Sequence, residues 1–154
     1  KNVFAVPLSI KAKMDSQFNN ISYHHVSSTL IETLVANHKN QTGKKMYVHV
    51  QSTHFETVLI DGKNLIFYNT FNYQSPEDFI YYLLFVYEQL QLNPEKIDTV
   101  FIGEIEKSSS IYTFANKYIR TIKFGERADS SDFSYQLQTL PKHSYFTLFN
   151  SYLA

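Results

Sequence analysis

The sequence predicts an α/β fold in which a mixed sheet carries helices on both faces. Three strand-like segments follow one another in the middle of the chain, and a strongly apolar capped helix comes next. A continuous apolar run after that helix is typical of a strand buried on both faces. Short turns join antiparallel strands, whereas a helical connection joins parallel ones, so we expect both kinds of pairing in one sheet.

Composition limits the possible functions. A chain of 154 residues can bury a core of its own. It has no cysteine, which excludes thiolate metal sites and internal disulfides and favours a cytoplasmic location. Lys plus Arg and Asp plus Glu both number 14, so no nucleic-acid partner is expected. The apolar run from Phe79 to Tyr87 falls well short of the ~20 residues of a membrane span, and none is predicted.

The first 43 residues predict the order strand, helix, strand, helix. An apolar run at 3–6 ends at Pro7, and residues 21–24 alternate as in a strand. The apolar positions expected on the two helices are Ile10, Met14 and Phe18, and then Leu30, Ile31, Leu34 and Val35 after an N-cap at Ser27 or Ser28. The polar segment 40–45 contains Gly43 and is the expected boundary between two units, 1–43 and 44–154.

Three strands are expected next, at 46–51, 55–61 and 65–71. The connections at 51–54 and 61–64 are short enough for hairpin turns. The three strands should therefore form an antiparallel meander.

The capped helix begins after this meander. Ser75 suits the N-cap, Pro76 the first helical position, and Asp78 completes a start that resembles a capping box. One helical face carries Phe79, Leu83, Val86 and Leu90, and the opposite face is led by Tyr81 and Phe85. Two interpretations remain open: both faces belong to the core, or Tyr81 and Phe85 are exposed and bind a partner.

The last third of the chain predicts further strands and helices. A strand over 96–105 contains the apolar run 99–102 and should lie parallel to a meander strand. Serines at 108–110 can cap a helix, and residues 121–124 form a short strand. No element is assigned to 125–140. The expected last helix opens at Pro141 and carries Tyr145, Phe146, Phe149, Tyr152 and Leu153 on one side.

From Met46 onward this order is that of a ribonuclease-H-like lobe, and two such lobes in tandem form the actin-like ATPases. The segments that carry a closer resemblance are Asn69–Phe71, Glu77–Leu84, Glu88–Leu90, Gly103–Ile105 and Pro141–Phe146. They resemble an uncharacterised family from Bacteroidetes, domain of unknown function 3822, which has an actin-like ATPase fold. The resemblance implies a complete second lobe at 44–154, preceded by the C-terminal part of a first lobe. It brings no established activity.

The resemblance also indicates where a nucleotide would bind. The second phosphate loop of actin-like ATPases uses an aspartate and glycines; here His49 stands in the place of the aspartate, and Gln51 and Ser52 in those of the glycines. Of the paired glycines on the adenosine side, Gly103 is kept and Glu104 follows it. Histidine suits hydrated Mg²⁺ poorly, and a carboxylate repels phosphate, so we predict a degenerate nucleotide site without ATP or Mg²⁺ as cofactor.

Other chemistry finds little support. A ribonuclease H centre needs clustered carboxylates, one on the strand position held by His49, while Glu56, Asp98 and Glu104 are scattered acids. His49 and His54 flank a turn, but no third ligand is evident, so no metal site is predicted. No catalytic residue is assigned.

Two functions remain open. The first is a non-catalytic interaction or scaffold module that binds a protein partner or a second copy through Tyr81 and Phe85. The alternative is a nucleotide-binding or ATPase protein whose site is completed by residues absent from this chain. A third function, single-stranded nucleic-acid binding through Tyr47 and Tyr68, is disfavoured by the balanced charge.

Overall fold

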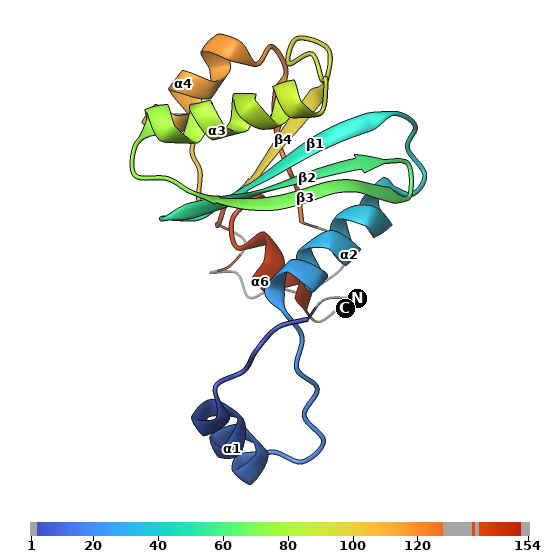
Figure 1. Ribbon diagram of the computed structural model, residues 1–154, viewed down its shortest axis with the longest axis vertical. Helices are drawn as coiled ribbons and strands as arrows, with labels where there is room; N and C mark the ends of the chain where they lie inside the picture. Colours follow the sequence, from blue (N-terminus) through green and yellow to red (C-terminus); the bar gives the residue numbers. More distant parts are fainter. Residues whose placement is uncertain (1–2, 128–136, 138, 152–154) are drawn as a thin grey trace.

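A five-stranded sheet lies between two layers of helices (Figure 1). The computed structural model describes residues 3–127, 137 and 139–151. The elements in chain order are α1 (Leu8–Gln17), α2 (Val26–His38), β1 (Lys44–Val50), β2 (His54–Asp61), β3 (Asn64–Asn72), α3 (Pro76–Gln89), β4 (Asp98–Gly103), α4 (Ser110–Tyr118), β5 (Ile122–Phe124) and α6 (Phe146–Asn150). The predicted α/β fold, a mixed sheet with helices on both faces, is confirmed.

The strand order is β3-β2-β1-β4-β5. β1, β2 and β3 pair antiparallel, as the meander prediction requires. β4 pairs parallel to β1, and β5 pairs parallel to β4. The connection through α3 therefore returns the chain to the far side of β1, so the sheet is mixed as predicted.

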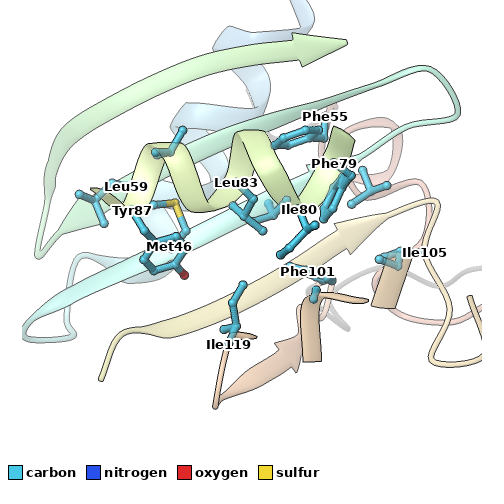
Figure 2. Packing of buried hydrophobic residues seen from close by; sticks show 14 residues of the cluster. Met46, Phe55, Leu59, Phe79, Ile80, Leu83, Tyr87, Phe101, Ile105 and Ile119 are labelled. Atoms are coloured by element: carbon cyan, nitrogen blue, oxygen red, sulfur yellow. The ribbon is translucent and has the colours of Figure 1, made fainter. Parts of the chain in front are cut away.

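One face of the sheet is covered by α3 and α4. Phe79 and Leu83 point from α3 toward the strands, with Phe101 of β4 opposite them (Figure 2). The ring of Phe79 lies 4.4 Å from that of Phe55 and 6.1 Å from that of Phe101, between centroids. The predicted apolar stripe of this helix is thus the centre of the larger core.

The opposite face is covered by α2 and α6. Its buried apolar residues are Leu30, Leu34, Tyr47, Val58, Ile60, Val100, Ile102 and Phe146. Because neighbouring residues of a strand point to opposite faces, the run Thr99 to Ile102 supplies both cores. The prediction that this strand is buried on both faces is confirmed.

The start of α3 follows the sequence closely. Ser75 Oγ accepts a hydrogen bond from the backbone N–H of Asp78 at 3.1 Å, and Pro76 is the first helical residue. Asp78 Oδ2 accepts in return from the N–H of Gln74, also at 3.1 Å, one residue earlier than a capping box prescribes. These two hydrogen bonds together determine where the helix begins.

The two strands predicted at 3–6 and 21–24 are wrong. Neither segment forms a strand, and α1 between them lies apart from the sheet with no buried residue (Figure 1). An apolar run becomes a strand only where another strand binds its backbone groups, and neither segment meets one. The observed order before β1 is therefore helix, helix instead of strand, helix, strand, helix.

The apolar face of α2 was predicted, but its N-cap residue was not. His25 takes the N-cap position, and its Nδ1 accepts from the N–H of Ser27 at 3.2 Å, so the helix starts earlier than Ser27 or Ser28. Leu30 and Leu34 pack on the sheet formed by residues 44–124. The division at residue 43 into two lobes stays a prediction, although α2 contributes to the core of the second.

The last helix does not open at Pro141. It begins at Phe146, because Tyr145 takes a left-handed conformation with φ 52° that no helix continues through. The preceding turn is held by β4: the carbonyl of His143 accepts from Gly103 N at 2.8 Å, and its Nε2 bonds the Ile105 carbonyl at 2.7 Å. Tyr152 and Leu153, as well as 128–136 and 138, lie outside the described residues.

Candidate functional site

The structure brings four of the five predicted nucleotide-loop residues together where β1 and β4 end. Val50 lies opposite Gly103, with His49 and Gln51 on either side of Val50. Glu104 follows Gly103, and its N–H donates to the Val50 carbonyl at 2.7 Å. Ser52 lies apart from these contacts, exposed in the β1–β2 turn.

Gly103 is required at this junction. Its φ is +91°, and a Cβ would lie 2.2 Å from the Val50 carbonyl oxygen and 2.9 Å from Cδ2 of His49. Both the backbone conformation and the space thus exclude a side chain. The glycine that the resemblance places on the adenosine side therefore serves the contact between β4 and His49.

His49 forms a buried pair with Glu56. The two residues are cross-strand partners in β1 and β2, and they are 1% and 5% exposed. His49 Nδ1 lies 2.6 Å from Glu56 Oε2, while the Tyr68 hydroxyl donates to Glu56 Oε1 at 2.7 Å. Both carboxylate oxygens are thereby hydrogen-bonded, which a buried charge requires.

These bonds decide the ionisation of Glu56. Burial by itself would raise the pKa of the carboxyl, but the hydrogen bonds from His49 and Tyr68 outweigh it and hold the pKa below its ordinary value. Glu56 is consequently a carboxylate at neutral pH. Its negative charge, on β2 opposite His49, opposes the binding of an anion nearby.

The second ring nitrogen of His49 is also occupied. Gln51 Nε2 lies 2.9 Å from His49 Nε2, so the amide donates and this ring nitrogen accepts. Both ring nitrogens of His49 are therefore in hydrogen-bond contact with a neighbouring side chain. We name the hydrogen-bonded set Gln51, His49, Glu56 and Tyr68 the polar cluster.

The β1–β2 turn offers no phosphate cradle. The N–H of Gln51 donates to the His54 carbonyl at 2.9 Å, which closes the turn upon itself. None of residues 51–54, all of them described, has the positive φ found in a nest of N–H groups. His54 bonds its neighbour Thr53 instead of approaching the His49 ring nitrogens, and no group of three His, Cys, Asp or Glu in the described part of the chain could hold a metal.

A hollow of about 480 Å³ lies beyond the end of β4. Glu104 and Glu106 line it together with serine, isoleucine and tyrosine side chains, and no Lys or Arg is among its lining residues. Two carboxylates at its wall favour cations and oppose phosphate. The sequence-based expectation that Glu104 opposes a nucleotide agrees with this position.

Tyr81 and Phe85 are exposed on α3. Their exposed fractions are 64% and 44%, whereas Phe79 and Leu83 on the same helix are 0% exposed. The Tyr81 ring contacts that of Tyr82 at 5.3 Å between centroids. Of the two interpretations of this helix, the structure agrees with the one in which the second face is uncovered.

Glu56 and Tyr68 escaped the sequence-based site prediction. The sequence did contain a signal for Glu56. A turn over 51–54 sets position 49 opposite position 56, and an acid opposite a histidine on a buried face is expected to form a hydrogen bond. Tyr68 was considered for stacking on nucleic-acid bases, but its hydroxyl is bound within the polar cluster.

Comparison with known proteins identifies a family and a fold. Residues 1–122 match the family described as "Protein of unknown function (DUF3822)". A comparison with curated proteins finds no match. Within the described residues, no helix combines the length and apolarity needed to cross a membrane.

Solved structures give the same fold. A Bacteroides thetaiotaomicron protein with actin-like ATPase fold and unknown function is 24% identical, with a TM-score of 0.70 over 78% of this chain. The chain spans 47% of that protein's length. An AlfA filament bound to AMPPNP is 14% identical over 78% of this chain and 44% of its own, with a TM-score of 0.43, which is too low to support an argument.

Proposed function

The chain belongs to the DUF3822 family of proteins of unknown function, and we propose that it serves as a non-catalytic interaction module built on the actin-like fold. In this proposal the position of the phosphate loop is filled by side chains, and α3 presents the surface that a protein partner contacts. A cytoplasmic location suits a chain without cysteine. Residues 1–43, with the exposed α1, would belong to a first lobe.

The polar cluster is the observation that carries the proposal. A nucleotide site needs N–H groups and cations that await an anion, but here the polar groups of His49 and Glu56 are already bonded to one another. The hollow beyond the end of β4 adds two more carboxylates, Glu104 and Glu106. A phosphate would therefore have to displace satisfied hydrogen bonds and approach like charge, both of which cost free energy.

The exposed aromatic side chains support the interaction part of the proposal. Tyr81 and Phe85 lie on the exposed side of α3, and Tyr82, which contacts Tyr81, stacks on Phe71 of β3 at 5.5 Å between ring centroids. Aromatic residues are enriched at the centres of protein interfaces, where their burial contributes much of the binding free energy. We name Phe71, Tyr81, Tyr82 and Phe85 the aromatic patch.

The proposal is tested by removing the two exposed rings. The free energy of unfolding of the double variant Tyr81→Ser/Phe85→Ser should lie within about 0.5 kcal/mol of the wild-type value, because these side chains are exposed. A benzoylphenylalanine placed at Tyr81 of the full-length protein in cells should give a discrete photo-crosslinked product. Tyr118, 51% exposed on α4, is the matched position that should give none.

Two results would contradict the interaction module. One is strong destabilisation of the double variant, which would mean that the rings serve the fold. The other is the same crosslinking pattern from positions 81 and 118, or none from either.

One observation favours the alternative, a nucleotide site completed by residues outside this chain. Gly103 has a positive φ, which only glycine adopts readily and which lets another group come close to the backbone, and it precedes Glu104 at the wall of the 480 Å³ hollow. Residues from another lobe could supply the cations that the hollow lacks. Direct titration with nucleotide separates the two functions.

A further inference from the structure

Among the described residues, no strand pairs with the outer edge of β3. β3 is an end strand of nine residues, and none of them is charged (Figure 1). Natural edge strands usually carry lysine, proline or a bulge that prevents pairing with another chain. β3 has one irregularity, opposite Leu59 and Ile60, which leaves the stretch 67–72 regular, with Leu65 and Ile66 43% and 48% exposed beside it.

The register shows which backbone groups face outward. The bond from Gln51 N to the His54 carbonyl makes 51 and 54 a hydrogen-bonded pair, so residues 54, 56 and 58 turn their backbone groups toward β1. The intervening residues of β2 bond β3 at Asn69 and Phe71. The backbone groups of Tyr68, Thr70 and Asn72 therefore point away from the sheet.

One of these outward backbone groups, the N–H of Thr70, is already hydrogen-bonded to a side chain in place of a neighbouring strand. The N–H of Thr70 donates to Oδ1 of its own neighbour Asn69 at 2.9 Å. A side chain from the adjacent residue here occupies the position of a strand partner. The contact is local and exposed, so an incoming strand could replace it.

We infer that the partner of the aromatic patch is a second copy of this chain, which pairs β3 with β3 about a two-fold axis at Thr70. This inference rests on the proposed interaction function and specifies its partner. Antiparallel pairing of this kind sets Thr70 opposite Thr70 of the second copy and Tyr68 opposite Asn72. It uses all three outward-facing residues and avoids the irregular part of β3.

β3 carries no charge that would repel a second copy of itself. In a two-fold interface every residue meets residues of the same surface, so a charged strand would meet like charges. An uncharged strand meets none, and like charges opposite each other are what most opposes such pairing. No charge repulsion therefore opposes the pairing of β3 with its own copy.

The same pairing also covers the aromatic patch. Phe71 lies on the α3 face of β3 and stacks on Tyr82, which contacts Tyr81. With the axis at Thr70, Phe71 stands opposite Asn69 of the second copy and diagonal to its Phe71. Diagonal neighbours on one sheet face lie within reach of aromatic side chains. The exposed rings of α3 and the open strand edge thus form one continuous surface.

A disulfide tests the register. The chain has no cysteine, so Thr70→Cys introduces a single thiol at the proposed axis. Hydrogen-bonded antiparallel partners lie about 5.5 Å apart between Cα atoms, within the range that a disulfide spans. Mild oxidation of full-length Thr70→Cys should give mostly covalent dimer. Thr113→Cys, exposed on α4, should remain monomeric, and equal crosslinking of both variants would overturn the inference.

A charge variant gives the complementary test. Thr70→Lys places two ammonium groups face to face and should weaken dimerisation at least about tenfold in sedimentation equilibrium. Thr113→Lys should dimerise as wild type does, and both should keep the wild-type circular dichroism spectrum. A Thr70→Lys protein that associates like wild type would contradict the pairing.

The crosslink at Tyr81 separates the inference from the function on which it rests. A product of twice the chain's mass supports a second copy. A product with a different protein, together with a monomeric Thr70→Cys variant, overturns the second copy and leaves the interaction module standing. If Tyr81 gives no crosslinked product and Thr70→Cys forms no disulfide, both the second copy and the interaction module are contradicted.

Discussion

The two faces of the sheet bury similar apolar residues but end differently where β1 meets the turn. Under α3 and α4 the strands end in apolar and aromatic residues, Val50, Phe55 and Phe101, and the buried Thr99 hydroxyl bonds the hydroxyl of Tyr87. Under α2 and α6, β1 and β2 change from apolar residues at Tyr47 and Val58 to the polar His49–Glu56 pair, while Ile102 of β4 beside His49 stays apolar.

This difference separates two roles within one sheet. The α3 face gains its stability from area and ring packing, which no single hydrogen bond decides. The polar cluster contributes differently, because each of its members is satisfied only while the others remain in place.

The largest effect is expected from breaking the α3 face. Phe79→Ala removes a fully buried ring that contacts Phe55 and Phe101, and should cost about 3–5 kcal/mol of unfolding free energy. Urea denaturation followed by circular dichroism measures it. Phe85→Ala, on the exposed side of the same helix, is the matched control and should change stability much less. Equal losses would mean that α3 has no exposed face.

Breaking the polar cluster comes next. His49→Leu leaves the buried Glu56 carboxylate with one of its two side-chain partners, and should cost about 2–4 kcal/mol. The double variant His49→Leu/Glu56→Leu removes the orphaned charge and should be no less stable than the single variant. A double variant with the sum of both single losses would show that the two residues do not act as a pair.

The pH dependence of stability distinguishes the two faces further. The pKa of Glu56 is lowered in the folded state, so the carboxylate stabilises the fold above its unfolded pKa, and this contribution is lost as the pH falls through the folded pKa. Glu56→Gln should be less stable than wild type by about 1.5–3 kcal/mol at neutral pH.

The stability difference between wild type and Glu56→Gln should shrink as the solution is made acidic. Denaturation midpoints measured from neutral pH into the acid range test this. A difference that stays constant over that range would mean that the charge of Glu56 contributes nothing.

A smaller effect is expected at the start of α3. Ser75→Ala removes the N-cap bond to the N–H of Asp78 and should cost about 1 kcal/mol. Ser109→Ala removes the corresponding bond at α4, where Ser109 Oγ accepts from Tyr112 N at 3.2 Å, and should cost a similar amount. Thermal unfolding compares the two. No loss in either variant would show that packing alone sets these helix ends.

The sequence predicted most of the sheet and α3 because their signals are local. Alternation and short turns define the meander, and Ser75 with Pro76 defines the helix start. The strands expected at 3–6 and 21–24 failed because strand formation depends on a distant partner. The helix expected at Pro141 failed for a similar reason, since His143 is held by the end of β4.

The nucleotide site stays a prediction, and the contacts among its residues could not be read from the sequence. His49 and Gly103 lie close together, and the Val50 carbonyl and the His49 ring exclude a side chain at 103, because β1 and β4 pair in this parallel register. That Glu56 and Gln51 occupy both ring nitrogens of His49 depends on side-chain directions that spacing alone does not give.

Calorimetric titration of Mg·ATP into the full-length protein tests the central claim most directly. In the proposed interaction module, satisfied side chains fill the position that the resemblance assigns to the phosphate loop, so we expect no saturable heat at nucleotide concentrations up to about 1 mM. Saturable binding with a Kd of about 10 μM or tighter would contradict the account, because it would show that the polar cluster does not exclude nucleotide.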